Sequence, residues 1–133
     1  MRRRTGFTLI EVLIVIVVIA ILAAIVIPRL LGAGRSAREA SLLAHLQELR
    51  NAIALFQAQC GMYPEQLSDL MVTSAPSYVH APDYQGPYLT TSDGNLPKDP
   101  VTGAADWTYS ATSGAIHSAA TGNNLAGVAY TSL

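Results

Sequence analysis

The sequence predicts an α+β fold, in which a long N-terminal helix packs on a small C-terminal antiparallel sheet. Two observations support this prediction. A helical pattern, first wholly apolar and then amphipathic, runs from near the N-terminus to Cys60. The segment after Cys60 is rich in turn residues and carries short runs of strand character. With 133 residues, the chain has room for one small domain beside the apolar segment.

The first expected element is an apolar helix. Every residue from Val12 to Ile27 is Val, Leu, Ile or Ala, and Leu9–Ile27 supplies 19 positions. A bilayer is crossed by about 20 apolar residues. Glu11 lies at the head of this run, where a carboxylate is costly unless a specific group accepts its charge. Glu11 is therefore a candidate functional residue.

The helical pattern changes at Pro28. Proline removes one backbone donor and clashes with the preceding turn, and Gly32 and Gly34 lower helix propensity. We therefore expect a kink or a melted stretch across Pro28, Gly32 and Gly34.

An amphipathic helix is expected to follow and to end at Gly61. Its apolar stripe recurs at steps of four and three residues and consists of Leu42, Leu46, Leu49, Ile53 and Phe56. Charged residues lie largely off the stripe, namely Arg38, Glu39, Glu48 and Arg50. The stripe is expected to pack on the domain that follows, in one core with Trp107.

Beyond the helix, the pattern predicts short elements joined by turns. A short helix is expected from Pro64 to Met71, with Pro64 at its first position. Strands are expected at 107–111 and 115–119 around a Ser113-Gly114 turn, and a last strand at 126–130.

The order of the N-terminal features resembles the type IV prepilin signature. Three arginines precede Gly6 and the run Phe7-Thr8-Leu9-Ile10-Glu11, which leads into the apolar segment. The family comprises type IV pilins and the pseudopilins of type II secretion. The resemblance implies a type IV pilin-like fold, cleavage between Gly6 and Phe7, and methylation of the Phe7 amine. It also implies that Glu11 pairs with the Phe7 amine of a neighbouring subunit during assembly.

This resemblance divides the chain into three parts. Residues 1–6 are the prepilin leader, residues 7–34 the hydrophobic transmembrane and filament-core helix, and residues 35–133 the globular domain. Two other interpretations of the N-terminus are a Sec signal peptide and a plain membrane anchor. The apolar run continues past Ala23-Ala24, where a signal peptide would be cut, and the pilin interpretation already includes an anchor.

A second resemblance concerns the domain, which is similar to major pseudopilins. It rests on three segments: Gly61-Met62-Tyr63-Pro64, Gly86-Pro87-Tyr88-Leu89 and Leu96-Pro97-Lys98-Asp99-Pro100. Major pseudopilins commonly bind calcium in a C-terminal loop, but this chain has no Asp or Glu after Asp106. Calcium requires several oxygen ligands with carboxylates among them, so we predict no metal site and no cofactor.

Cysteine usage also favours a pseudopilin or a disulfide-free pilin. Cys60 is the single cysteine, so an intrachain disulfide is impossible. We expect a buried small apolar residue there, with a bridge between subunits as the alternative.

The resemblance implies a structural subunit of a helical filament, most similar to the major pseudopilin of a type II secretion-like system. The alternative is a type IV pilus pilin for adhesion, motility or DNA uptake. Implied partners are other copies of the chain, minor pilins or pseudopilins, the prepilin peptidase, the inner-membrane platform protein and the assembly ATPase. The subunit would cross the inner membrane once before assembly, and then form a periplasmic or cell-surface filament.

Catalysis and nucleic-acid binding are not predicted. His45, His80 and His117 share no metal-ligand spacing with one another or with Cys60, and no glycine-rich phosphate loop is present. The formal net charge of −1 gives no basic surface for nucleic acid.

Overall fold

The computed structural model describes residues 6–133, apart from the side chain of Leu31. The predicted leader therefore lies outside the described residues except for Gly6. Along the chain, the fold divides into two compact units, one up to Ser36 and one from Ala37 to Leu133. The predicted boundary between residues 34 and 35 stays a prediction.

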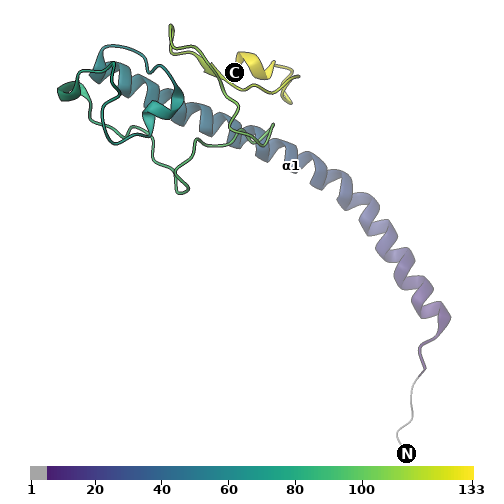
Figure 1. The fold of residues 1–133 in the computed structure, drawn as a ribbon. Helices are drawn as coiled ribbons and strands as arrows, with labels where there is room; N and C mark the ends of the chain where they lie inside the picture. The colour runs from purple at the N-terminus through teal and green to yellow at the C-terminus, as the bar shows by residue number, and fades with distance from the viewer. Residues whose placement is uncertain (1–5) are drawn as a thin grey trace, which may run out of the picture. The chain divides into compact units, whose positions relative to one another are not determined.

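A single helix, α1, spans Leu9–Cys60 and contains Pro28 in its interior (Figure 1). The alternative of a melted stretch at Pro28–Gly34 is wrong, because Gly32 and Gly34 also keep helical backbone. One proline removes only one intrahelical hydrogen bond, and the strong helix formers on both sides keep the others. A kink at these residues stays a prediction. Gly61 ends α1 as predicted, with φ +71° and its N–H bonded to the Gln57 carbonyl oxygen at 2.9 Å.

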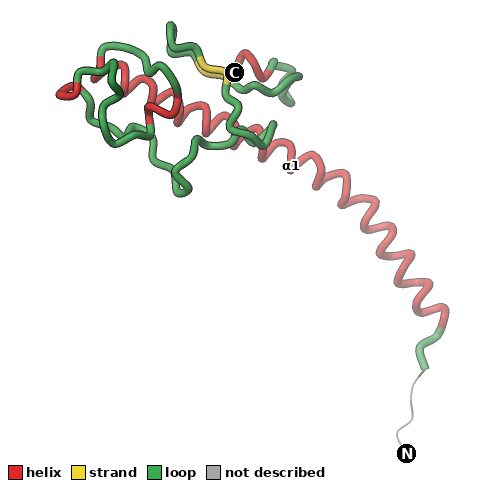
Figure 2. The backbone as a smooth tube through the Cα atoms, in the orientation of Figure 1, coloured by secondary structure: helices red, strands yellow, loops and turns green. Residues whose placement is uncertain are grey.

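The second unit consists mainly of loops that lie along the C-terminal half of α1 (Figure 2). Its short elements are η1 (Leu67–Leu70), η2 (Ala81–Asp83), β1 (Thr108–Tyr109), β2 (Ile116–His117) and η3 (Tyr130–Ser132). The two strands pair antiparallel, so the α+β class is confirmed.

The hairpin is shorter than predicted but has the predicted turn. Thr108 pairs with His117, and Tyr109 pairs with Ile116. Gly114 closes the turn with φ +69°, and a Cβ there would lie 2.3 Å from Cε1 of Tyr63. Glycine is therefore required at this position by both its backbone angle and its packing.

Two predicted elements differ in the structure. The short helix begins at Leu67 rather than Pro64, because a capping box between Gln66 and Asp69 sets its start. The strand expected at 126–130 is absent from this stretch of the described chain. There the side-chain Oδ1 of Asn124 accepts hydrogen bonds from the N–H groups of residues 126 and 128, at 3.0 and 2.8 Å. The backbone forms a loop instead, with one bridge between Asn123 and Ala129.

One core holds the second unit together, as predicted. The stripe residues Leu42, Leu46, Leu49, Ile53 and Phe56 are all buried, and they share a cluster with Trp107, Ile116 and Tyr130. The Nε1–H of Trp107 donates to the Pro97 carbonyl oxygen at 2.7 Å, so its polar edge is also satisfied.

Candidate functional site

The predicted processing and assembly residues lie at the start of α1. Gly6 and Phe7 precede the helix, and Thr8 occupies its N-cap position. The Thr8 N–H and hydroxyl donate to Oε2 of Glu11 at 2.8 and 2.6 Å, and the Glu11 N–H approaches the Thr8 hydroxyl oxygen at 3.3 Å. This is a capping box, in which N-cap and N3 side chains satisfy each other's backbone donors.

The capping box gives Glu11 a second role that the sequence analysis did not predict. The signal was present, since Thr8-x-x-Glu11 followed by an apolar run has the capping-box spacing. In the single subunit, the described hydrogen bonds of the Glu11 carboxylate all come from Thr8, at the start of the same helix. Any partner in an assembly must compete with, or add to, these bonds.

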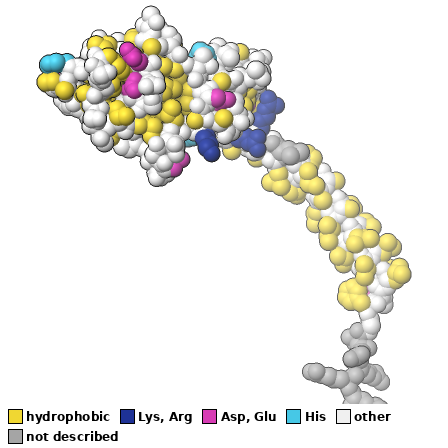
Figure 3. Space-filling model, viewed as in Figure 1, with side chains coloured by type: hydrophobic (Ala, Val, Ile, Leu, Met, Phe, Trp, Pro, Cys, Tyr) yellow, Lys and Arg dark blue, Asp and Glu magenta, His cyan; other side chains and the backbone are white. Residues whose placement is uncertain are grey.

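The apolar part of α1 has no protein cover in the single subunit. Phe7 and Leu9 are 77% and 85% exposed, and the large side chains from Ile10 to Ile27 are about half exposed. Figure 3 shows hydrophobic side chains over this segment on the face in view. A shallow hollow of about 450 Å³ lies beside the first turns, lined by Phe7, Thr8, Leu9, Val12, Leu13 and Ile16. Such a surface requires lipid or other apolar helices around it.

By length and composition, this part of α1 is able to cross a membrane, and it is the one such helix in the described part of the chain. Pro28, Gly32 and Gly34 follow it within the same helix. A Cβ added at Gly32 or Gly34 would meet no atom within 4 Å, so packing within the subunit does not require glycine at either position.

In the second unit, Asp99 organises the Leu96–Pro100 segment. Its side chain is fully buried, and Oδ1 accepts the Val101 N–H at 2.7 Å. Oδ2 accepts the hydroxyl of Ser118, which is also fully buried. The neighbouring Lys98 carbonyl oxygen lies 3.1 Å from Nδ1 of His45 on α1. His45 is therefore half-buried in a contact with this loop.

The other two pseudopilin-like segments are fixed by backbone and tyrosine hydrogen bonds. The hydroxyl of Tyr109 donates to the Pro64 carbonyl oxygen at 2.7 Å. The N–H groups of Tyr88 and Leu89 both donate to the Leu70 carbonyl oxygen, at 2.8 and 2.9 Å. Burial and the nearby Asp69 carboxylate raise the pKa of Tyr109 to about 12. Tyrosine hydroxyls thus replace much of the hydrogen bonding that longer strands would supply.

Tyr78 also forms hydrogen bonds through its hydroxyl. Its hydroxyl donates to the Asp69 carboxylate at 2.5 Å and accepts the Glu65 N–H at 3.0 Å. Burial, followed by the bond to Asp69, raises the pKa of Tyr78 well above its ordinary range. The buried carboxylate of Asp69 is thereby satisfied without a cation.

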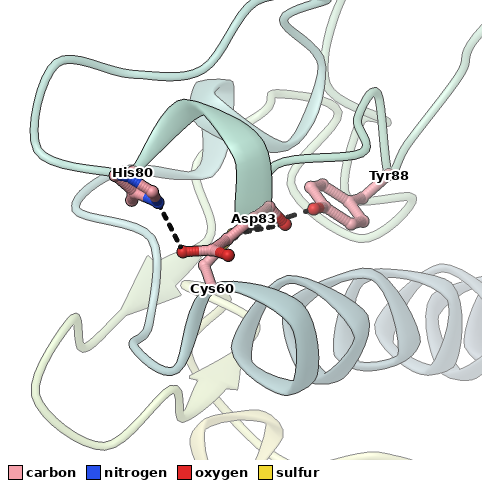
Figure 4. Close-up of polar contacts among 4 residues, drawn as sticks. All are labelled: Cys60, His80, Asp83 and Tyr88. Carbon is pink, nitrogen blue, oxygen red and sulfur yellow. Dashed lines mark hydrogen bonds and ion pairs between the residues drawn. The ribbon is translucent and has the colours of Figure 1, made fainter.

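Cys60 is half-buried rather than fully buried at the end of α1 (Figure 4). Its Sγ lies 3.7 Å from the Tyr88 hydroxyl and 4.0 Å from the Asp83 carbonyl oxygen. The Asp83 carboxylate itself lies 3.1 Å from Nδ1 of His80, on the exposed side of η2. The thiol therefore packs against the edge of the core, next to Tyr88.

Glu39 has a role that was not predicted from the sequence. Its carboxylate accepts hydrogen bonds from the Leu125 N–H and the Tyr130 hydroxyl.

Within residues 6–133, no group of three or more His, Cys, Asp or Glu side chains is arranged to hold a metal ion. The absence of a calcium site stays a prediction.

Comparison with known families gives two matches that adjoin along the chain. Residues 1–27 match the prokaryotic N-terminal methylation motif, and residues 29–126 match type II secretion system protein G. No solved structure matches the chain.

Individual relatives agree with the family match. The chain is 36% identical over 103 residues to the type II secretion system core protein G of Vibrio cholerae, covering 75% of this chain and 67% of the relative. It is 33% identical over 103 residues to the core protein G of Klebsiella pneumoniae, covering 75% and 71%. The type IV wide pilus major component PilA4 of Thermus thermophilus is 40% identical over 82 residues, covering 59% and 63%. The chain therefore belongs to the type II secretion system protein G family.

Proposed function

We propose that this chain is the major pseudopilin of a type II secretion-like system, the repeating subunit of a helical filament that acts in protein export across the outer membrane. The observation that carries the proposal is the protein G match over residues 29–126, joined to an N-terminal methylation motif. The uncovered apolar part of α1 supports it, because a filament core buries such surfaces against one another. The role is structural, and no catalytic step is assigned to the chain.

Processing is proposed to occur between Gly6 and Phe7. Both residues precede α1, so the bond between them lies outside the helical hydrogen-bond ladder. The mature chain would begin with a methylated Phe7 amine. Mass spectrometry of assembled material should find this N-terminus, and Gly6→Val should block the cut because a branched side chain would crowd the peptidase site. Intact Met1 in assembled filaments would contradict the processing proposal.

Glu11 is proposed to set the register of assembly. A charge buried among apolar helices without a partner costs about 3–5 kcal/mol. In the proposed filament, the Phe7 amine of a neighbouring subunit supplies that partner, so a subunit in another register is disfavoured. The capping box holds the Glu11 carboxylate at the first turn of α1, close along the chain to its own Phe7. The local bonds thus orient the carboxylate before a neighbour arrives.

The test compares membrane-held subunit with sheared filament for wild type, Glu11→Leu, Glu11→Asp and the control Glu48→Gln. Glu48 is an exposed acid on the same helix, so its replacement should not affect assembly. Glu11→Leu should insert normally, because it removes the charge from the apolar run, and should be cleaved, but should give little filament. Glu11→Asp keeps the charge with a shorter reach and should assemble in part. A wild-type filament yield from Glu11→Leu, with no wild-type subunit present, would refute the register role.

A surface type IV pilus is the second candidate, and the similarity to PilA4 favours it. The two functions give different phenotypes. Deleting the gene should abolish export of secreted enzymes if the filament is a pseudopilus, and should abolish surface motility or DNA uptake if it is a pilus.

The chain is membrane-anchored through α1. We propose that it lies in the inner membrane before assembly and in a periplasmic or cell-surface filament afterwards. Its proposed partners are other copies of itself, minor pseudopilins, the prepilin peptidase, the platform protein and the assembly ATPase. Fractionation of membranes from wild-type and peptidase-deficient cells would test both the location and the peptidase.

A further inference from the structure

Glu39 occupies a position of α1 where the core stripe calls for an apolar residue. The stripe alternates steps of four and three from Phe56 back to Leu42, and a further step of three lands on Glu39. The side chain is half-buried there, although the charged residues were expected to lie largely off the stripe. A carboxylate that faces a core is costly unless hydrogen bonds satisfy it. The partners of Glu39 therefore indicate what the residue does.

Two of these partners come from the other end of the chain. The Leu125 N–H lies 2.9 and 3.0 Å from the two carboxylate oxygens, across 86 residues of sequence. The hydroxyl of Tyr130 donates to Oε1 at 2.9 Å, across 91 residues. Hydrogen bonds to an ionised acceptor are roughly twice as strong as neutral ones. One side chain of α1 thus binds both a backbone and a side-chain donor of the C-terminal segment.

The segment that Glu39 binds is a closed loop, residues Gly122–Tyr130, hereafter the C-terminal loop. Its ends join through the Tyr130 N–H, which donates to the Gly122 carbonyl oxygen at 3.1 Å. Inside the loop, Asn124 takes part in most of the hydrogen bonds. Its N–H donates to the Val128 carbonyl oxygen at 2.8 Å, and its side-chain oxygen accepts the Val128 N–H. The loop therefore keeps its own shape through local bonds.

The loop has little apolar contact to hold it on the domain. Leu125 and Val128, its two large aliphatic side chains, are 55% and 43% exposed. Tyr130, at the end of the loop, is buried, and its hydroxyl donates a hydrogen bond to Glu39. An intrachain disulfide is not available, because Cys60 is the single cysteine.

We propose that Glu39 is a positioning residue that fastens the C-terminal loop to α1, and that its carboxylate fixes where Leu125 and Val128 are presented on the subunit surface. The position within the stripe explains why an acid is present: a leucine would extend the core but would leave the Leu125 N–H and the Tyr130 hydroxyl without their acceptor. Glu39 acts through the loop that it holds, and the proposal goes beyond the filament role.

The test measures amide hydrogen exchange of the full-length chain in detergent micelles, before any assembly. Peptides covering residues 122–130 report on the loop, and peptides covering residues 42–56 report on the core helix. In Glu39→Leu, the loop peptides should exchange about tenfold faster or more. The loop then opens more easily, because the hydrogen bonds to the Glu39 carboxylate are no longer there to be broken. The core-helix peptides should keep the wild-type rate, since leucine continues the apolar stripe.

Three further variants sharpen the result. Glu39→Gln keeps the shape and one acceptor oxygen without the charge, so its loop rate should lie between wild type and Glu39→Leu. Glu48→Gln, on the exposed side of α1, is the matched control and should change neither rate. Tyr130→Phe should accelerate loop exchange on its own but add little to Glu39→Leu, because both remove one shared contact.

The proposal is overturned if the loop of Glu39→Leu exchanges at the wild-type rate. It is equally overturned if loop and core helix accelerate by the same factor, because Glu39 would then support the whole domain rather than the loop. Since the measurement uses unassembled subunits, its outcome is independent of whether the filament serves export.

Discussion

Replacing Asp99 should destabilise the second unit more than replacing any exposed acid of the chain. The Asp99 carboxylate is fully buried and accepts the Val101 N–H and the Ser118 hydroxyl on opposite oxygens. Asp99→Ala removes both acceptors and leaves one buried donor, the Ser118 hydroxyl, and one part-buried donor, the Val101 N–H, without this partner, each costing about 1–3 kcal/mol. The sum is about 2–6 kcal/mol, which is a large part of the 5–15 kcal/mol that typically stabilises a domain.

Asp99→Asn separates the two bonds. The amide oxygen can still accept the Val101 N–H, but the amide nitrogen then faces the Ser118 oxygen, which already accepts the Ala120 N–H at 3.0 Å. The serine hydroxyl proton loses its charged acceptor, so the loss should be about 1–3 kcal/mol, smaller than for alanine. Asp93→Asn, at an exposed turn, should cost under about 0.5 kcal/mol and serves as the control.

Denaturant titration of the full-length chain in micelles would measure these changes. Trp107 is the sole tryptophan, and its Nε1–H is bonded to Pro97, two residues before Asp99, so its fluorescence reports on this region. The double variant Asp99→Ala with Ser118→Ala should lose less than the two single losses together, since both remove one shared bond. A loss of stability under about 1 kcal/mol for Asp99→Ala would refute the view that this carboxylate organises the Leu96–Pro100 segment.

Four further outcomes are expected. Trp107→Ala should cost about 3–5 kcal/mol in the same titration, and a fragment starting at Arg35 should unfold cooperatively without detergent; a broad, non-cooperative transition would contradict the division into stalk and domain. The pKa of Tyr109 is raised to about 12 from an ordinary value near 10, so its contribution to stability is complete below about pH 10 and is lost as the pH rises toward 12. Melting curves should show this decline, and Tyr109→Phe should make it shallower. Calcium should leave the melting temperature unchanged, whereas a bound ion would raise it.

Features encoded by neighbouring residues were predicted well from the sequence. The stripe from Leu42 to Phe56 and the end of α1 at Gly61 depend on local spacing and on one glycine, and both are confirmed. The capping box of Thr8 and Glu11 is equally local, and its spacing would have revealed it.

Features that depend on distant partners were not predictable in this way. The contact of His45 with the Lys98 carbonyl spans 53 residues, and that of Tyr109 with the Pro64 carbonyl spans 45. Such bonds join distant parts of a unit whose strands, β1 and β2, are only two residues long. Glu39 lies between these cases: its place in the stripe was visible, but its donors, near the end of the chain, were not.

The loop-rich second unit has a consequence for the order of folding. The contacts within the C-terminal half of α1 are local, so we expect them to form first, whereas the Tyr109 and Glu39 bonds close long stretches of chain and are expected to form later. The helix is therefore a template on which the rest condenses. Until the rest of the unit has packed on the helix, the apolar stripe from Leu42 to Phe56 faces water, and exposed apolar surface of this kind promotes aggregation. A subunit tethered in a membrane by the preceding residues would pass through this vulnerable interval spaced apart from its copies, and would enter a filament only after the stripe is covered.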